Sequence, residues 1–210
     1  MKKEKKEEVC WAVSGNLCID FINTLEWRRD KLKKIERLPD FSAMIQWSKY
    51  YKIIDNNHAQ SIIKKALLEP TLAKKAYHKA IGLRELLYNI FSSMARTGKV
   101  SPPDLALFNQ FFSDSLGKLW SVIPSERGFV WSFNLEKDSL DFFLGPILKS
   151  AADLLVSPEL NRVKECANNA CGWLFIDNSR NRSRRWCSMK SCGNRAKAHR
   201  HYLSRKSRKD

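Results

Sequence analysis

The chain has 210 residues, of which 43% are hydrophobic, enough for one good core and a small satellite module. No apolar run reaches the roughly 18 residues of a membrane span, and residues 1–16 lack the apolar region of a secretory signal. We therefore expect a soluble, cytoplasmic protein with no membrane partner and with reduced cysteines, whose net charge of +16 suits a polyanionic partner.

The first elements are predicted to be short. Residues 9–13 can form a strand, and apolar residues at helical spacing predict a buried helix over residues 17–27 with Asn16 as its N-cap. A basic loop follows over residues 28–39. Asp40 then caps a second helix, whose apolar side is formed by Phe41, Met44, Ile45 and Trp47 or Ser48.

The middle of the chain predicts longer helices. A short helix is expected over residues 57–68, and the longest periodic segment runs from Pro70 to Gly98, where glycine acts as the C-terminal stop. Its apolar stripe consists of Leu72, Ala76, Ala80, Leu83, Leu87, Ile90, Phe91 and Met94. The next helix begins at residues 101–103 and presents Leu105, Phe108, Phe111, Phe112 and Leu116.

The pattern then changes from helical to alternating. Apolar residues over 119–133, with a turn around 124–128, predict a β-hairpin, and a helix resumes over 140–156. Residues 157–163 form the joint to the C-terminal part. The expected fold is mainly α with a small β-hairpin or sheet (α+β) over residues 1–160, followed by a small four-cysteine zinc finger over residues 161–210.

Four of the six cysteines form two matched pairs near the C-terminus, Cys166 with Cys171 and Cys187 with Cys192. Each pair encloses four residues, and fifteen residues separate the pairs. With this spacing, two tight turns can converge on one tetrahedral Zn²⁺ through four thiolates. One structural zinc ion is therefore the predicted cofactor.

Two alternatives use the same segment. Two disulfides would need an oxidising compartment, and His199 or His201 could replace one cysteine as a ligand. Four well-placed thiolates make a histidine unnecessary, and a closed four-cysteine shell leaves no position for an activated water, so we expect no catalysis by this zinc. The remaining cysteines, Cys10 and Cys18, are predicted to be reduced core residues.

Positive charge is concentrated around the cysteine pairs. Residues 162–210 hold fourteen lysines and arginines against three acids, a net charge of +11, whereas the preceding residues carry +5. The loop between the pairs and the helix predicted after Cys192 are therefore expected to bind nucleic acid. The candidate contact residues are Arg180, Arg182, Arg184, Arg185, Arg195, Lys197, Arg200 and Arg205. A groove-reading helix and a non-specific phosphate-binding tail both remain open.

Apolar side chains in this basic segment also have expected positions. Trp173, Phe175 and Trp186 are predicted to form a small core for the finger. The terminal helix is expected to dock through one narrow face, made of Arg195, Ala196, Ala198, His199, Tyr202 and Leu203.

Two segments resemble known families. Residues 166–202, CANNACGWLFIDNSRNRSRRWCSMKSCGNRAKAHRHY, resemble the CGNR-type zinc finger, which is named for the tetrapeptide at 192–195. The motif LCIDFINT at residues 17–24 is similar to the opening of the ABATE domain, which precedes that finger in bacterial stress-induced transcription regulators. The resemblance implies a DNA-binding regulator with a helical or α/β N-terminal domain.

The N-terminal domain offers a few polar residues among apolar ones. Asp20 and Thr24 lie four apart on the first predicted helix, Asn23 lies beside them, and Arg84 is a candidate partner for Asp20. These side chains could line a ligand pocket. Alternatively, they cap the helix or hydrogen-bond to neighbouring backbone in a satisfied core.

We therefore expect a zinc-stabilised, DNA-binding transcription regulator of bacterial type rather than an enzyme. Its N-terminal domain would sense a small-molecule effector, form a homodimer, or do both. Two alternatives stay open. One is RNA recognition through stacking on Trp173 or Trp186. The other is an N-terminal enzyme that uses Asp20 as an acid or base and is tethered to nucleic acid by the finger.

Overall fold

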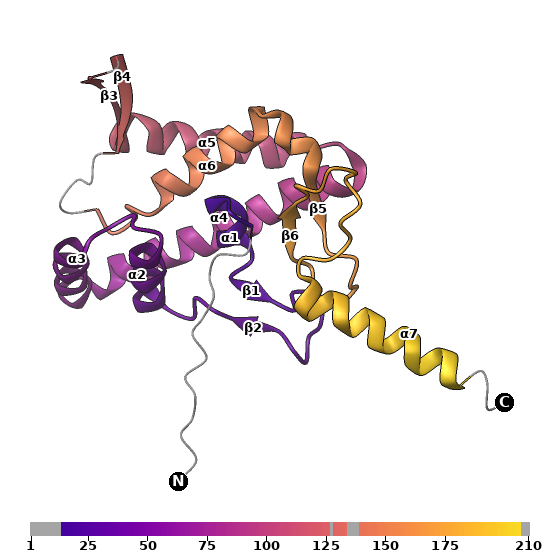
Figure 1. The fold of residues 1–210 in the computed structure, drawn as a ribbon. Helices are drawn as coiled ribbons and strands as arrows, with labels where there is room; N and C mark the ends of the chain where they lie inside the picture. The colour runs from indigo at the N-terminus through magenta and orange to yellow at the C-terminus, as the bar shows by residue number, and fades with distance from the viewer. Residues whose placement is uncertain (1–13, 127, 134–138, 207–210) are drawn as a thin grey trace, which may run out of the picture.

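The computed structural model describes residues 14–126, 128–133 and 139–206. The fold is mainly helical with three two-stranded antiparallel sheets, which confirms the predicted fold class (Figure 1). The elements are α1 (Leu17–Ile22), β1 (Leu25–Glu26), β2 (Ile35–Glu36), α2 (Phe41–Tyr50), α3 (Asn56–Leu68), α4 (Pro70–Thr97), α5 (Pro102–Leu119), β3 (Trp120–Ser125), β4 (Gly128–Phe133), α6 (Leu144–Val156), β5 (Val163–Glu165), β6 (Leu174–Ile176) and α7 (Asn194–Lys206). The strand expected over residues 9–13 lies outside the described residues.

Helix α4 is the axis of the fold. Its 28 residues span about 42 Å, with α2 and α3 packed at its N-terminal end and β5 at its C-terminal end (Figure 1). The helix ends as predicted at Gly98, which adopts the left-handed conformation with φ of 70°. The buried stripe begins at Ala73, whereas Leu72, expected in the stripe, is 48% exposed. Met94, also expected in the stripe, is only half-buried. The apolar residues buried along α4 are Ala73, Ala76, Ala80, Leu83, Leu86, Leu87, Ile90 and Phe91.

The first helix is shorter than predicted. Asn16 is its N-cap, as expected, because its side chain accepts a hydrogen bond from the backbone N–H of Ile19. The helix ends at Ile22 rather than at residue 27, because Leu25 and Glu26 pair with β2. The segment expected to be a basic loop, residues 28–39, therefore contains a strand. A ribbon of two-residue strands is too short to leave a readable period in the sequence.

The other helices follow their sequence signals more closely. Asp40 caps α2, as predicted, through a 2.8 Å hydrogen bond from the N–H of Ala43. Helix α3 begins at Asn56 behind the N-cap Asp55. Helix α6 begins at Leu144 rather than at Leu140, so its proline lies in the first turn, where no intrahelical N–H is required.

The predicted hairpin is present as β3 and β4, paired from Trp120–Phe133 to Ser125–Gly128. It projects from the body beyond the C-terminal end of α5 (Figure 1). Among the described residues, no helix is both long enough and apolar enough to cross a membrane.

Candidate metal centre and nucleic-acid interface

The four predicted cysteines converge on one point. Cys166 and Cys171 lie in the loop that joins β5 to β6, and Cys187 and Cys192 precede α7. All four are buried and free, and their sulfur atoms lie within 4.8 Å of one another. The Sγ atoms of Cys171 and Cys187 are 3.7 Å apart. A regular zinc–thiolate tetrahedron has edges of about 3.8 Å, so the cluster fits one zinc ion, and the two alternative disulfides are not formed.

Hydrogen bonds around the sulfurs hold the two cysteine turns together. The backbone N–H of Cys187 donates to the sulfur of Cys166 at 3.5 Å, and the Asn168 amide donates to that of Cys192 at 3.6 Å. The N–H of Ala167 in the first turn also donates to the carbonyl of Arg185 before the second. Such outer contacts orient metal ligands. A zinc ion bound here would crosslink the two turns and would have a closed ligand shell.

Aromatic rings surround the cluster. Phe175 is fully buried, and Trp173 and Trp186 pack against the cysteines, which confirms the predicted small core. No pattern in the sequence indicated a fourth ring, Trp27, which reaches the cluster from the loop after β1. A Cβ at Gly193 would lie 2.7 Å from the sulfur of Met189, so the flexible, exposed side chain of Met189 would have to shift to accept one.

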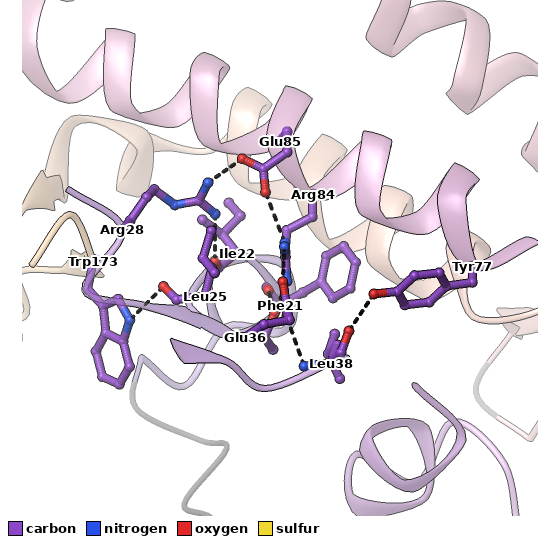
Figure 2. Close-up of polar contacts among 11 residues, drawn as sticks. Phe21, Ile22, Leu25, Arg28, Glu36, Leu38, Tyr77, Arg84, Glu85 and Trp173 are labelled. Carbon is purple, nitrogen blue, oxygen red and sulfur yellow. Dashed lines mark hydrogen bonds and ion pairs between the residues drawn. The ribbon is translucent and has the colours of Figure 1, made fainter. Parts of the chain in front are cut away.

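The finger is docked on the helical part rather than tethered to it. The Asn23 side chain forms two hydrogen bonds with the backbone of Leu174, at 2.9 and 3.0 Å. The N–H of Arg28 donates to the carbonyl of Cys171, and the indole N–H of Trp173 donates to the carbonyl of Leu25 (Figure 2). Leu174 and its β6 neighbour Ile176 also belong to the main hydrophobic core. The zinc cluster and the helices therefore share packing.

The polar residues predicted to bind a ligand are all buried. Asp20 accepts a hydrogen bond from the N–H of Ser14 at 2.8 Å, and the hydroxyl of Thr24 donates to the carbonyl of Phe21. Asn23, as described, holds β6. In the described residues each of these side chains has at least one hydrogen-bond partner within the protein.

Arg84 has a different carboxylate partner from the one expected. Its guanidinium makes a bidentate pair with Glu36, at 2.7 and 2.6 Å, and also donates to Glu85 and to the hydroxyl of Thr24 (Figure 2). Asp20 is not among the partners described for it. Burial alone would lower the pKa of Arg84, but the hydrogen bonds and charge of Glu36 raise it. The pair fixes β2 against α4.

We expect Glu36→Ala to lower the free energy of unfolding by about 3 kcal/mol, because Arg84 would stay buried without its bidentate partner and keep, among the described residues, only the single ion pair with Glu85. Urea unfolding followed by circular dichroism measures the change. Glu26→Ala in the neighbouring strand is the matched control: it breaks a more exposed pair with Arg37 and should cost less than about 1 kcal/mol. Equal losses in the two variants would contradict the assigned role of Glu36.

The loop between the cysteine pairs is organised by Asp177. Its carboxylate accepts hydrogen bonds from Lys164, Ser179 and the N–H of Arg184. Burial by itself would raise the pKa of Asp177, but the bonds from Lys164 and Ser179 hold it well below its usual range. The loop is therefore shaped by a carboxylate that stays ionised.

The predicted nucleic-acid residues fall into two groups. Arg184 is engaged inside the finger: its guanidinium donates to the carbonyls of Trp186 and Cys187 and lies 4.4 Å from the centre of the Phe175 ring. Arg195 is exposed but lies over the ring of Trp27 at 4.3 Å. The other six are exposed to solvent: Arg180, Arg182, Arg185, Lys197, Arg200 and Arg205.

Helix α7 projects away from the body (Figure 1). The prediction that one face of it docks is wrong, because none of its residues is buried and Tyr202 is 64% exposed. Its apolar side chains are too few to bury a stripe, and the helix is held at its start by the turn at Met189–Gly193 and by the Arg195–Trp27 contact. Its basic side chains are therefore presented to solvent.

Comparison with protein families agrees with this architecture. The ABATE family, described as "Putative stress-induced transcription regulator", matches residues 15–158, and the CGNR zinc finger matches residues 162–205. No curated protein matches the chain. Because the first match alone covers more than half of the sequence, the chain belongs to the ABATE family, and it carries a CGNR zinc finger after the ABATE region.

Proposed function

We propose that this protein is a zinc-stabilised, DNA-binding transcription regulator, in which residues 161–210 contact DNA and residues 1–160 sense an effector, form a homodimer, or both. The observation that carries the proposal is the set of six exposed cations named above, which we call the basic surface. Within the described ranges none of them has an acidic partner. They lie on a loop and a helix that the cysteine cluster holds in place, in a chain whose family is one of regulators.

The shape of the finger favours duplex DNA. Helix α7 has 13 residues, so it is about 20 Å long, and an exposed helix of this kind can enter the major groove. The tryptophans are less suited to stacking on single-stranded RNA. Trp173 is half-buried and uses its indole N–H on Leu25, and Trp186 is half-buried against the cysteine cluster. We therefore place RNA recognition second.

The same surface suggests how specificity is reached. One short helix reads few base pairs, so a regulator of this size needs a second copy to bind a longer site. A homodimer bound to two half-sites meets that need. Catalysis has no part in the proposal, because four cysteine ligands would close the zinc shell.

Removing charges from α7 tests the proposal. We expect Lys197→Ala/Arg200→Ala to weaken binding to a random-sequence DNA duplex by about tenfold or more, because two phosphate contacts are lost. Fluorescence anisotropy at constant salt measures the affinity. Lys64→Ala/Lys75→Ala, which removes two exposed charges from α3 and α4, should change it less than about twofold. The proposal fails if both double variants lose the same affinity, or if the α7 variant loses only binding to single-stranded RNA.

A further inference from the structure

A second feature of the ABATE region is an apolar groove far from the basic surface. It lies between α2, α3 and the N-terminal half of α4, with a volume of about 540 Å³. This volume is typical of small-molecule sites. Its lining includes Phe41, Ile45, Ile63, Leu67, Ala73 and Tyr77. Two of these apolar side chains remain open to solvent, Ile63 at 38% and Leu67 at 76%, so an apolar ligand would cover them.

The charged groups of the groove point to the kind of ligand. Lys74 and His78, one turn apart on α4, both line it and are exposed. In the part of the chain that the structure describes, neither has an ion pair. The acid that lines the groove, Asp40, already accepts the hydrogen bond that caps α2. An apolar floor with a lysine at its edge that has no ion pair among the described residues fits a molecule with an apolar body and an anionic head.

The groove is connected to the finger by hydrogen bonds. The hydroxyl of Tyr77 donates to the carbonyl of Leu38 at 2.8 Å, and the N–H of Leu38 donates to Glu36 at 2.8 Å. Glu36 then pairs with Arg84, as described above.

From Arg84 the series of hydrogen bonds continues to the cysteine cluster. Arg84 donates to Glu85, which pairs with Arg28 (Figure 2). The backbone N–H of Arg28 donates to the carbonyl of Cys171 at 3.0 Å. The segment from β1 to α2 is thus fixed at one end by a residue of the groove and at the other by a zinc ligand.

We propose that this groove binds a small molecule with an apolar body and an anionic head, such as a medium-chain carboxylate. Its binding is communicated to the finger through the series of hydrogen bonds that runs from Tyr77 to Cys171. Tyr77 is the point of contact, because its ring lines the groove while its hydroxyl holds the backbone before α2. The structure shows Tyr77 bonded to Leu38, and a ligand that packs on its ring would communicate its presence by binding with different affinity when this hydrogen bond is formed and when it is broken. The proposal rests on the sensing role given to the ABATE region above.

Binding is tested with decanoate on the full chain by isothermal titration calorimetry. We expect one site per chain, and Ile63→Glu should weaken it at least tenfold, because a carboxylate would enter the apolar wall and repel the ligand. Leu105→Glu is the matched control, since Leu105 is similarly exposed, at 41%, and lies on α5 outside the lining of the groove. The affinity of this variant for decanoate should stay within twofold of that of the native protein. Decylamine, with the same chain and the opposite charge, should bind at least tenfold more weakly.

Three results would refute the proposed ligand site. They are the absence of decanoate binding, equal affinities for decanoate and decylamine, and equal losses of decanoate affinity in Ile63→Glu and Leu105→Glu. A dimer in sedimentation that Ile63→Glu converts to a monomer, without any decanoate binding, would instead assign the groove to a second copy of the chain. None of these outcomes depends on whether the protein binds DNA.

Communication is tested with Tyr77→Phe, which keeps the ring in the groove and removes only the hydrogen bond to Leu38. In the native protein, saturating decanoate should change two quantities at least fivefold: the affinity for duplex DNA and the rate of zinc transfer to a chelator. Tyr77→Phe should bind decanoate within twofold of the native protein and lose both effects. Unchanged effects in Tyr77→Phe, or none in the native protein, would refute the communication. If the protein binds no DNA, the proposed regulator function fails. The rate of zinc transfer then still tests whether the groove communicates with the finger.

Discussion

Replacing Cys171 with serine is expected to reduce bound metal from one zinc ion per chain to nearly none and to unfold the finger. The Cys171 sulfur is buried 3.7 Å from that of Cys187, where serine cannot supply a thiolate. Structural zinc contributes on the order of 10 kcal/mol to the folding of small modules, as much as the whole stability of a typical domain. Elemental analysis of the purified protein and hydrogen exchange over residues 163–206 measure the two losses.

The effect should extend beyond the finger. Because Leu174 and Ile176 pack in the main core and Asn23 bonds to Leu174, loss of zinc should also loosen the region around α1. Cys18→Ala is the control, since Cys18 is a fully buried cysteine of α1 outside the cluster. It should cost about 1–2 kcal/mol and keep its zinc. Native protein without metal, or full metal content in Cys171→Ser, would refute the zinc site.

What the sequence could predict was mostly local. The cysteine spacing predicted the cluster because each pair needs only one tight turn, and the structure brings all four sulfurs together. Asn16, Asp40 and Gly98 mark helix ends because a capping side chain or a left-handed glycine acts on its own neighbours. These signals do not depend on distant parts of the chain.

What the sequence missed depends on contacts between distant residues. Asn23 was a candidate ligand residue, but its partner is backbone 151 positions away. In the ribbon of β1 and β2, Glu36 pairs with Arg84, which lies 48 positions away. Sequence periodicity does not predict pairs of residues that are so far apart. A polar residue in an apolar helix gives the same sequence signal whether its side chain faces a ligand or bonds to another part of the protein.

The basic segment shows the same limit. Composition marked Arg184 and Arg185 alike, as neighbours in one arginine-rich loop. In the structure the guanidinium of Arg184 is bonded inside the finger, whereas Arg185 is exposed. Docking of one face of α7 is predicted from the spacing of residues that include Tyr202 and Leu203, yet within the described part of the chain no residue of this helix is buried. Charge therefore identifies the candidate interface, and only the contacts separate the arginines bonded inside the finger from those exposed to solvent.

Because the structure distinguishes the exposed basic residues from those bonded inside the finger, the salt dependence of DNA binding tests directly whether the basic surface contacts phosphates. If its six residues each neutralise one phosphate, log K should fall with log salt with a slope of about −5. Affinity for a duplex should then drop about a thousandfold between roughly 50 and 200 mM salt. Fluorescence anisotropy across a sodium chloride series measures the slope.

The number of engaged phosphates can also be resolved residue by residue. Arg200→Ala should reduce the magnitude of the slope by about one, because Arg200 is exposed on α7 and its loss removes one released counterion. Arg184→Ala should leave the slope unchanged but destabilise the finger, because its guanidinium bonds to the carbonyls of Trp186 and Cys187. A salt dependence close to zero would mean that the basic surface binds a partner other than DNA.

A slope that changes in Arg184→Ala but not in Arg200→Ala would mean that the loop reaches the phosphates in a conformation other than the one described. Helix α7 would then be directed away from the duplex.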